Sequence, residues 1–303
     1  MAPLDLAGAG SGGREVTDAP ALDPRYVAAR RVLLDALSTL APHGKAIVVV
    51  GAQAVYLQTG LNDVALTIAP YTTDGDLALD PTLLGDEPEL EESMLSAGFR
   101  LLEREENRTQ PGIWCATEHI EGQDVVIPID LIVPEAAASN EGRRGARLGV
   151  HGNRAARRAV GLEAALVDHD TMTVSALDLS DERALTVEVA GVAALLVAKA
   201  HKIHDRVASG RVDRLSDKDA SDVYRIMQTA PPTDVAATLS ELVKHPLAGE
   251  VTGQALGYME ELFGRRAGEG VAMAQRALRL AIGEAEVATL CVSFTERLLV
   301  TRT

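Results

Sequence analysis

Two aspartates at positions i and i+2, Asp74 and Asp76, are the residues of this chain whose spacing points most directly to chemistry. They stand in the stretch Thr73-Asp74-Gly75-Asp76-Leu77. Residues i and i+2 of a strand point to the same face, so both carboxylates would converge on one point. Carboxylate oxygens suit Mg²⁺, which is commonly held by one or two carboxylates together with substrate phosphates. The alternative interpretation is a polar turn, because Asp and Gly are common turn residues.

A third carboxylate, Asp130, lies in a later apolar run. Residues 113–120 and 125–133 predict two strands, and the Glu-Gly-Gln segment 121–123 between them predicts an antiparallel hairpin. Asp130 shares a strand face with Val126, Pro128 and Ile132, where a charge is costly unless it is paired or bound to metal. Pro128 favours an edge strand or a bulge. We therefore expect Asp130 to be a metal ligand or one half of a structural ion pair.

The elements upstream must position these carboxylates. Asp23-Pro24 opens a helix that should run to about residue 40. Residues 46–50 are a short apolar run, which predicts a buried strand that breaks at Gly51. Residues 52–59 predict a helix closed by Gly60, the loop 62–73 is expected at the surface, and residues 86–97 predict another helix. The chain thus runs from strand through glycine turn and helix to the aspartate pair.

Composition excludes several classes of protein. The chain has 303 residues, a net charge of −15 and 47% hydrophobic residues, which is enough for a large core but argues against general nucleic-acid binding by bulk charge. The two cysteines, Cys115 and Cys291, lie far apart, so we expect free thiols and a reducing, cytoplasmic location. No run is long and apolar enough for a membrane span, and no signal peptide is expected, so a membrane partner is not expected.

A local basic segment, residues 143–158, is the exception to the acidic balance. It contains no acidic residue and holds six arginines: Arg143, Arg144, Arg147, Arg154, Arg157 and Arg158. Such a cluster positions phosphates without reading sequence. Three interpretations remain open: contact with a triphosphate, contact with an RNA acceptor, or an offset to acidic surface.

The order of elements predicts two domains behind a tail. Residues 1–22 are rich in Gly and Ala and predict a flexible tail. Residues 23–190 should form an α+β domain, and residues 191–303 should be helical throughout. Lys199 lies on the first helix of that second part, and Asp219 lies at the start of the next, where a capping-box acid would fall. Surface snorkelling of the lysine and interaction of the acid with the helix dipole are the simpler interpretations.

Together these features resemble the nucleotidyltransferase superfamily with the polymerase-beta-like fold. The matching motifs are residues 50–54 (Val-Gly-Ala-Gln-Ala), 73–77 (Thr-Asp-Gly-Asp-Leu) and 129–131 (Ile-Asp-Leu). The chain is most similar to AbiE-type, MenT-like nucleotidyltransferase toxins, through residues 195–199 (Leu-Leu-Val-Ala-Lys) and 218–222 (Lys-Asp-Ala-Ser-Asp). The resemblance covers roughly residues 45–230. One departure is Gly51-Ala52, where the family usually has Gly-Gly or Gly-Ser.

The resemblance implies an α+β nucleotidyltransferase fold, with a mixed β-sheet flanked by helices and an all-helical C-terminal domain. It also implies a cofactor, two Mg²⁺ ions, held by Asp74, Asp76 and Asp130. The NTP substrate would lie against the turn, near Gly51, Ala52 and Thr73. The catalytic residues would be Asp76, Lys199 and Asp219, with Lys199 neutralising developing charge and Asp219 orienting the lysine or the acceptor.

The expected reaction moves a nucleoside monophosphate from an NTP to an acceptor hydroxyl. The resemblance implies a toxin acting on RNA, at a tRNA 3′ end contacted through the segment Arg143 to Arg158, with an antitoxin protein as a partner. The alternatives are transfer to a small molecule such as an antibiotic, transfer to a protein, or a non-catalytic binding module on the same fold. The acidic balance slightly favours a small acceptor, whereas the arginines favour RNA.

Overall fold

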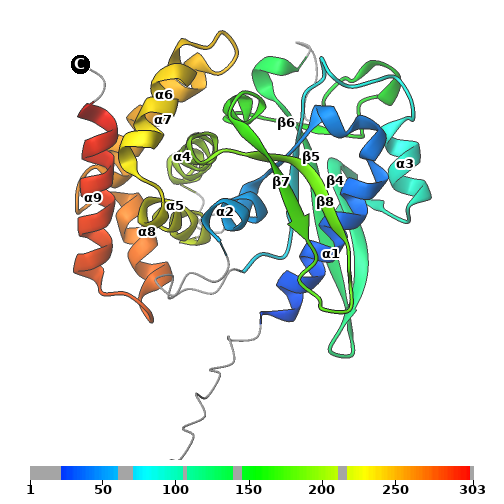
Figure 1. Ribbon diagram of the computed structural model, residues 1–303, viewed down its shortest axis with the longest axis horizontal. Coiled ribbons are helices and arrows are strands. Elements are labelled where there is room, and N and C mark those ends of the chain that lie inside the picture. Colours follow the sequence, from blue (N-terminus) through cyan, green and yellow to red (C-terminus); the bar gives the residue numbers. More distant parts are fainter. Residues whose placement is uncertain (1–21, 61–70, 105–107, 139–144, 211–216, 301–303) are drawn as a thin grey trace, which may run out of the picture.

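The computed structural model describes residues 22–60, 71–104, 108–138, 145–210 and 217–300. In these residues an α+β arrangement sets a mixed sheet beside a group of helices (Figure 1). The strands are β1 (Ile47–Val50), β2 (Gly75–Leu79), β3 (Arg100–Arg104), β4 (Arg108–Ile120), β5 (Gln123–Pro134), β6 (Arg157–Ala159), β7 (His169–Ser175) and β8 (Ala184–Ala190). Their order is β3-β4-β5-β2-β1-β8-β7, and β6 pairs with β5.

The centre of the sheet mixes both strand directions. β2 lies between β1 and β5, antiparallel to the first and parallel to the second. β1 is also parallel to β8. β1 is buried along its whole length, which explains why its sequence is a continuous apolar run rather than an alternating one. Because β1 and β2 are antiparallel, the carboxyl end of β1 lies beside the amino end of β2.

Helices α1 (Pro24–Thr39) and α2 (Gly51–Thr59) hold this region in place. The side chain of Asp23 caps α1 by accepting a hydrogen bond from the backbone of Arg25, as the Asp-Pro pair predicts. Arg30 of α1 is 2% exposed and donates to the side chain of Gln53 on α2 at 2.9 Å and to the carbonyl of Ser175 on β7 at 3.0 Å. This buried guanidinium ties α1, the first turn of α2 and the sheet together.

After β8 the described chain is helical. The helices are α4 (Val192–Ala208), α5 (Asp217–Thr229), α6 (Pro232–Lys244), α7 (Gly249–Phe263), α8 (Glu269–Leu278) and α9 (Glu284–Val300). They lie to one side of the sheet, and α2 packs against both α4 and α5 (Figure 1). Buried residues of the sheet and of these helices belong to one continuous hydrophobic cluster. The predicted boundary at residue 190 coincides with the last residue of β8, and the division into two domains stays a prediction.

Several local predictions are confirmed. The hairpin of β4 and β5 turns at Glu121 and Gly122, with φ of 50° and 82°, as a two-residue turn of the type I′ class requires. Both cysteines are free and buried. Within the described residues, no helix combines the length and apolar character needed to cross a membrane. The predicted tail lies outside the described residues, apart from Leu22.

Three predictions need correction. The helix expected over residues 86–97 is the shorter α3 (Leu90–Ser96), because Pro88 cannot lie inside a helix without removing a hydrogen bond. The loop before Asp74 is not wholly at the surface, since Thr72 is 0% exposed, and residues 62–70 lie outside the described part. β5 is an interior strand, but its pairing with β2 begins only at Ile129, so Pro128 stands where β5 has no partner on that side.

Candidate active site

Asp76 and Asp130 are neighbours across the centre of the sheet. Asp76 of β2 pairs in register with Val50 of β1 on one side and with Asp130 of β5 on the other. Because directly paired residues of adjacent strands point to the same face, the two carboxylates share one surface. The third residue of the predicted set, Asp74, lies just before β2. The structure thus brings together the acids that the sequence places 54 residues apart, from Asp76 to Asp130.

The glycine turn faces Asp76 directly. Gly51 is the first residue of α2 and has φ of 70°, a conformation that favours glycine. A Cβ added to Gly51 would collide with the carboxylate of Asp76. The N-cap residue of α2 is Val50, whose side chain cannot accept a hydrogen bond. The backbone N–H groups of the first turn are therefore not capped by a side chain of that residue. Ala52 is buried, so it can contribute its backbone and not a side chain to a ligand.

Asp74 is held from the helical side of the molecule. The hydroxyl of Thr72 donates to the carboxylate of Asp74, and Lys218 of α5 donates to the same hydroxyl at 2.8 Å. Thr73, the predicted nucleotide contact, is partly exposed between them. The Lys218-Thr72 chain therefore fixes Asp74 next to the Asp76 carboxylate without occupying Asp76 itself.

Electrostatics at the pair are unfavourable in the absence of a cation. Burial raises the pKa of Asp76 to about 6, and the nearby charges of Asp74 and Asp130 add to the effect. Burial also raises the pKa of Asp130, although Arg157 opposes this. Carboxylates that repel each other in this way favour either a proton or a bound cation. Raised values of this kind are typical of functional sites and also of some structural clusters.

Arg157 is the counter-charge of Asp130. Its Nε and Nη2 atoms donate to the same oxygen, Oδ2 of Asp130, at 3.0 and 2.6 Å. The ion-pair alternative for Asp130 is therefore present in the structure. The described residues contain no group of three or more His, Cys, Asp or Glu side chains already placed to hold a metal ion. The donor chemistry of Asp74, Asp76 and Asp130 nevertheless fits Mg²⁺, because carboxylate oxygens are hard donors. The guanidinium of Arg157 is the cation that contacts Asp130 in this structure.

Lys199 and Asp219 lie in a buried ion cluster. Lys199 is 4% exposed and donates to Oδ1 of Asp219 at 2.7 Å and to Oδ2 of Asp222 at 2.6 Å. Burial lowers the pKa of Lys199, but Asp219 and Asp222 raise it more, so the pKa lies well above its usual range. Burial raises the pKa of Asp219, yet Lys199 and then Lys202 lower it further, to well below its usual range.

This cluster alters two of the predicted roles. Asp219 accepts a hydrogen bond from Lys199, which is the contact that its predicted orienting role requires, and the role itself stays a prediction. The residue that would cap this helix, Ser216, lies outside the described residues, so the capping-box interpretation also stays a prediction. Lys199 is already matched by two carboxylates, which leaves little of its charge for a phosphate. Lys202, which lies 3.1 Å from Asp219 and has a 45% exposed side chain, is the lysine of this helix that reaches the solvent. Arg206 also pairs with Asp219.

Lys202 and Arg206 had no role in the sequence-based site. Lys199, Lys202 and Arg206 stand at i, i+3 and i+7, the spacing of one helix face. That periodicity was the signal that could have identified them. Asp222, three residues after Asp219, follows the same rule on α5. Which of these groups would be buried depended on how α4 and α5 pack.

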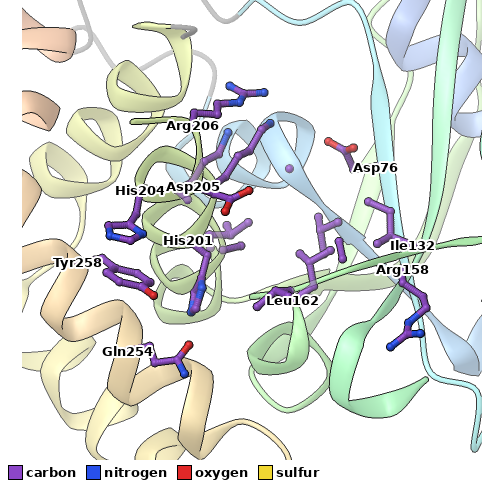
Figure 2. Close-up of a pocket in the computed structure, with 18 of the residues that line it drawn as sticks. Asp76, Ile132, Arg158, Leu162, His201, His204, Asp205, Arg206, Gln254 and Tyr258 are labelled. Carbon is purple, nitrogen blue, oxygen red and sulfur yellow. The ribbon is translucent and has the colours of Figure 1, made fainter. Parts of the chain in front are cut away.

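A cavity of about 570 Å³ lies between Asp76 and the cations of α4. Its volume lies in the usual range for small-molecule sites. One wall is formed by the sheet and the glycine turn, and the other by α4 and α7 (Figure 2). Its cationic lining residues are Arg157, Arg158, Lys199, Lys202 and Arg206. Across the cavity from Asp76, Figure 2 shows His204, Tyr258 and Gln254 on the helical wall.

The basic segment does not act as one surface in the described residues. Arg143 and Arg144 lie outside them. Arg154 lies 3.6 Å from Glu91, Arg157 pairs with Asp130, and Arg158 pairs with Glu135. Of the described arginines of the segment, the cavity is lined by Arg157 and Arg158. The RNA contact predicted for the segment therefore stays a prediction.

Comparisons with known proteins leave the family open. No protein-family model matches the chain, and no curated protein matches it.

Proposed function

We propose that this chain is a Mg²⁺-dependent nucleotidyltransferase with a nucleotidyltransferase fold, moving a nucleoside monophosphate from an NTP to an acceptor hydroxyl. The observation that carries the proposal is the register pairing of Asp76 with Asp130 directly beside Gly51. Asp76 and Gly51 border a cavity that is also lined by cationic side chains. Carboxylates, a glycine turn at a helix N-terminus and cations are the three components that phosphoryl chemistry requires. The sequence resemblance points to the same reaction.

Asp76, Asp130 and Asp74 are the residues that would hold Mg²⁺. When bound, Mg²⁺ would neutralise phosphate charge and lower the pKa of an attacking hydroxyl. A cation at this position would also stabilise the ionised form of Asp76, whose pKa is raised to about 6 by burial and by its neighbours Asp74 and Asp130. A protein without such a ligand would gain stability by losing that charge.

The protein's own groups would bind and align the nucleotide. The free N–H groups at the start of α2 suit a triphosphate, because a helix N-terminus carries a partial positive charge. Lys202 and Arg206 line the same cavity and add charge stabilisation. Lys199 positions the start of α5 through Asp219 and Asp222. Catalysis would come from alignment and charge, with no covalent intermediate on the protein.

The acceptor is the less constrained part of the proposal. A cavity of about 570 Å³ suits a nucleotide and the end of an acceptor, not a folded RNA. A toxin that modifies the 3′ end of tRNA is the reading we favour, with an antitoxin protein as its partner. Transfer to an antibiotic-like molecule or to a protein is the alternative within the same reaction.

A second candidate function is nucleotide binding without transfer. The pairing of Arg157 with Asp130 favours it, because the guanidinium occupies an oxygen that a metal would use. It predicts that the protein binds an NTP without transferring any part of it, and that removal of the Asp76 or Asp130 carboxylate leaves this binding unchanged.

The test is transfer of α-labelled NTPs. Wild type, Asp76→Asn and Asp130→Asn are incubated with each labelled NTP, Mg²⁺ and total tRNA, or with small hydroxyl-bearing acceptors. The matched control is Asp124→Asn on β5, whose side chain is 76% exposed and pairs with His119 at the far end of the hairpin from Asp130. It lies about 20 Å along the strand from Asp130, at about 3.3 Å per residue.

Label on tRNA with wild type and the control, and on no acceptor with the two site variants, is the expected result. Label on a small molecule alone would keep the reaction and replace the acceptor. Binding of NTP without transfer to any acceptor would favour the binding module. Undiminished transfer by Asp76→Asn would remove the site from the reaction.

A further inference from the structure

Arg157 stands where a cation would be expected. It comes from β6, the short strand that runs parallel to β5, and its side chain crosses to Asp130. Both contacting nitrogens bond one oxygen, Oδ2, and its side chain remains 30% exposed to the cavity. A guanidinium in this arrangement is anchored at one end and open to a ligand at the other.

The local charge balance leaves this site short of cations. Asp74, Asp76 and Asp130 contribute three carboxylates, and Arg157 is the cation in direct contact with one of them. The positive charges of Lys202 and Arg157 act on Asp76 from a distance without cancelling the effect of its acidic neighbours. Arg158, the next residue, turns to Glu135 and does not contact the acid group. Arg157 is therefore the one side chain of β6 that neutralises this cluster.

We infer that Arg157 is a built-in counter-ion that exchanges places: it holds Asp130 in the empty site, and moves to the phosphates of the NTP when Mg²⁺ takes the carboxylate. The inference rests on the proposed function for the nature of the ligand. The guanidinium is suited to both positions, because its planar fork binds carboxylate and phosphate with the same geometry. The exposed part of the side chain already borders the cavity that also includes Gly51 and Asp76.

The exchange makes the binding of metal and nucleotide cooperative. Without nucleotide, Mg²⁺ must displace Arg157 from Asp130, which weakens metal binding. With nucleotide present, the displaced guanidinium finds a new anionic partner, and the cost is recovered. Coupling of this kind is reciprocal, so Mg²⁺ must strengthen nucleotide binding by the same factor. Arg157 is thus a positioning residue that keeps the metal from binding to the site alone.

The experiment measures Mg²⁺ and ATP separately, with no turnover. The Mg²⁺ concentration that gives half of the thermal shift is determined with and without ATP for wild type and Arg157→Met. ATP binding is measured by calorimetry at saturating Mg²⁺. The control is Arg158→Met, which removes the same charge from the adjacent residue and the same cavity. Arg157→Lys, which keeps the charge but not the fork, is measured as well and replaces Arg157→Met if that variant does not fold.

Arg157→Met should bind Mg²⁺ alone at a several-fold lower concentration than wild type, and ATP about 10-fold or more weakly. The stimulation of Mg²⁺ binding by ATP should be weaker than in wild type, and the part that remains is due to direct coordination of Mg²⁺ by the phosphates. The Mg²⁺ and ATP affinities of Arg157→Lys should lie between those of wild type and Arg157→Met. Arg158→Met should keep the wild-type coupling between Mg²⁺ and ATP binding. Unchanged or weaker Mg²⁺ binding by Arg157→Met, or equal effects in Arg158→Met, would overturn the inference.

The two proposals fail in different ways. Tighter Mg²⁺ binding and weaker ATP binding by Arg157→Met, in a protein that shows no nucleotidyl transfer, would support the exchange and rule out the proposed enzyme activity. Nucleotidyl transfer by wild type, with the same coupling of Mg²⁺ and ATP binding in wild type and in every Arg157 variant, would support the enzyme and rule out the exchange.

Discussion

Replacing Asp76 with asparagine should make the ligand-free protein more stable at neutral pH while it abolishes activity. Burial and the charges of Asp74 and Asp130 raise the pKa of Asp76 from 3.8 to about 6. A change of this size corresponds to at most about 3 kcal/mol against the ionised form. Because Asp76 is partly exposed to the cavity and shares its charge with two neighbours, we expect about 1–2 kcal/mol of the stabilisation to be measured.

The pH dependence follows from the direction of that change. The folded protein binds a proton at Asp76 more tightly than the unfolded chain, so stability from this residue is present below pH 4 and is lost as the pH rises to about 6. Asp76→Asn cannot ionise, so the variant does not lose this stability as the pH rises. The difference in free energy of unfolding between the variant and wild type should be small at pH 4 and reach its full value by pH 7.5.

The assay is urea unfolding at both pH values, with and without Mg²⁺. Mg²⁺ should stabilise wild type at pH 7.5 and leave Asp76→Asn nearly unaffected, because a ligand stabilises only the state that binds it. Asp124→Asn, at an exposed position on the hairpin of β4 and β5, should follow wild type throughout. A variant that is less stable than wild type at pH 7.5, or a difference that does not grow with pH, would refute the reasoning.

Three further results are expected. Gly51→Ala should cost about 1–2 kcal/mol by urea unfolding and abolish transfer, because the residue has φ of 70° and a methyl group would collide with Asp76; wild-type activity would contradict this. Lys199→Met should cost about 3–5 kcal/mol because it removes the cation that pairs with buried Asp222, although Asp219 keeps Lys202 and Arg206. Lys202→Met, at an exposed position, should cost less than about 1 kcal/mol because Asp219 keeps Lys199 and Arg206. Equal costs would contradict the burial argument. Burial raises the pKa of Cys291 to about 12, so this thiol should react with a thiol reagent only after unfolding, as mass spectrometry of the labelled peptide would show.

Local signals in the sequence predicted much of the fold. The Asp-Pro pair at 23 and 24, the apolar run before Gly51 and the Glu-Gly turn of the hairpin all became the expected elements. Each of these elements depends on a few neighbouring residues, so the sequence is sufficient to predict it. The resemblance to nucleotidyltransferases led us to expect Asp76 and Asp130 at one site, and the two residues pair in register.

Contacts between distant elements could not be read in the same way. Arg157 pairs with Asp130 because β6 adds beside β5, and nothing near either residue in the sequence specifies that pairing. Lys199 was expected to serve a phosphate, but the packing of α4 on α5 sets it between two carboxylates. Thr72 was expected in an exposed loop, but it is buried beneath Lys218. In all three cases a side chain's partner comes from another element, and burial decides its role.

The fate of α- and γ-labelled NTP tests the central claim most directly. Wild-type protein with Mg²⁺ and total tRNA should transfer the α-label to tRNA, release the γ-label as pyrophosphate, and do neither after Asp76→Asn. Transfer of the γ-label, or transfer of the α-label that survives the loss of Asp76, would contradict nucleotidyl transfer at the paired aspartates.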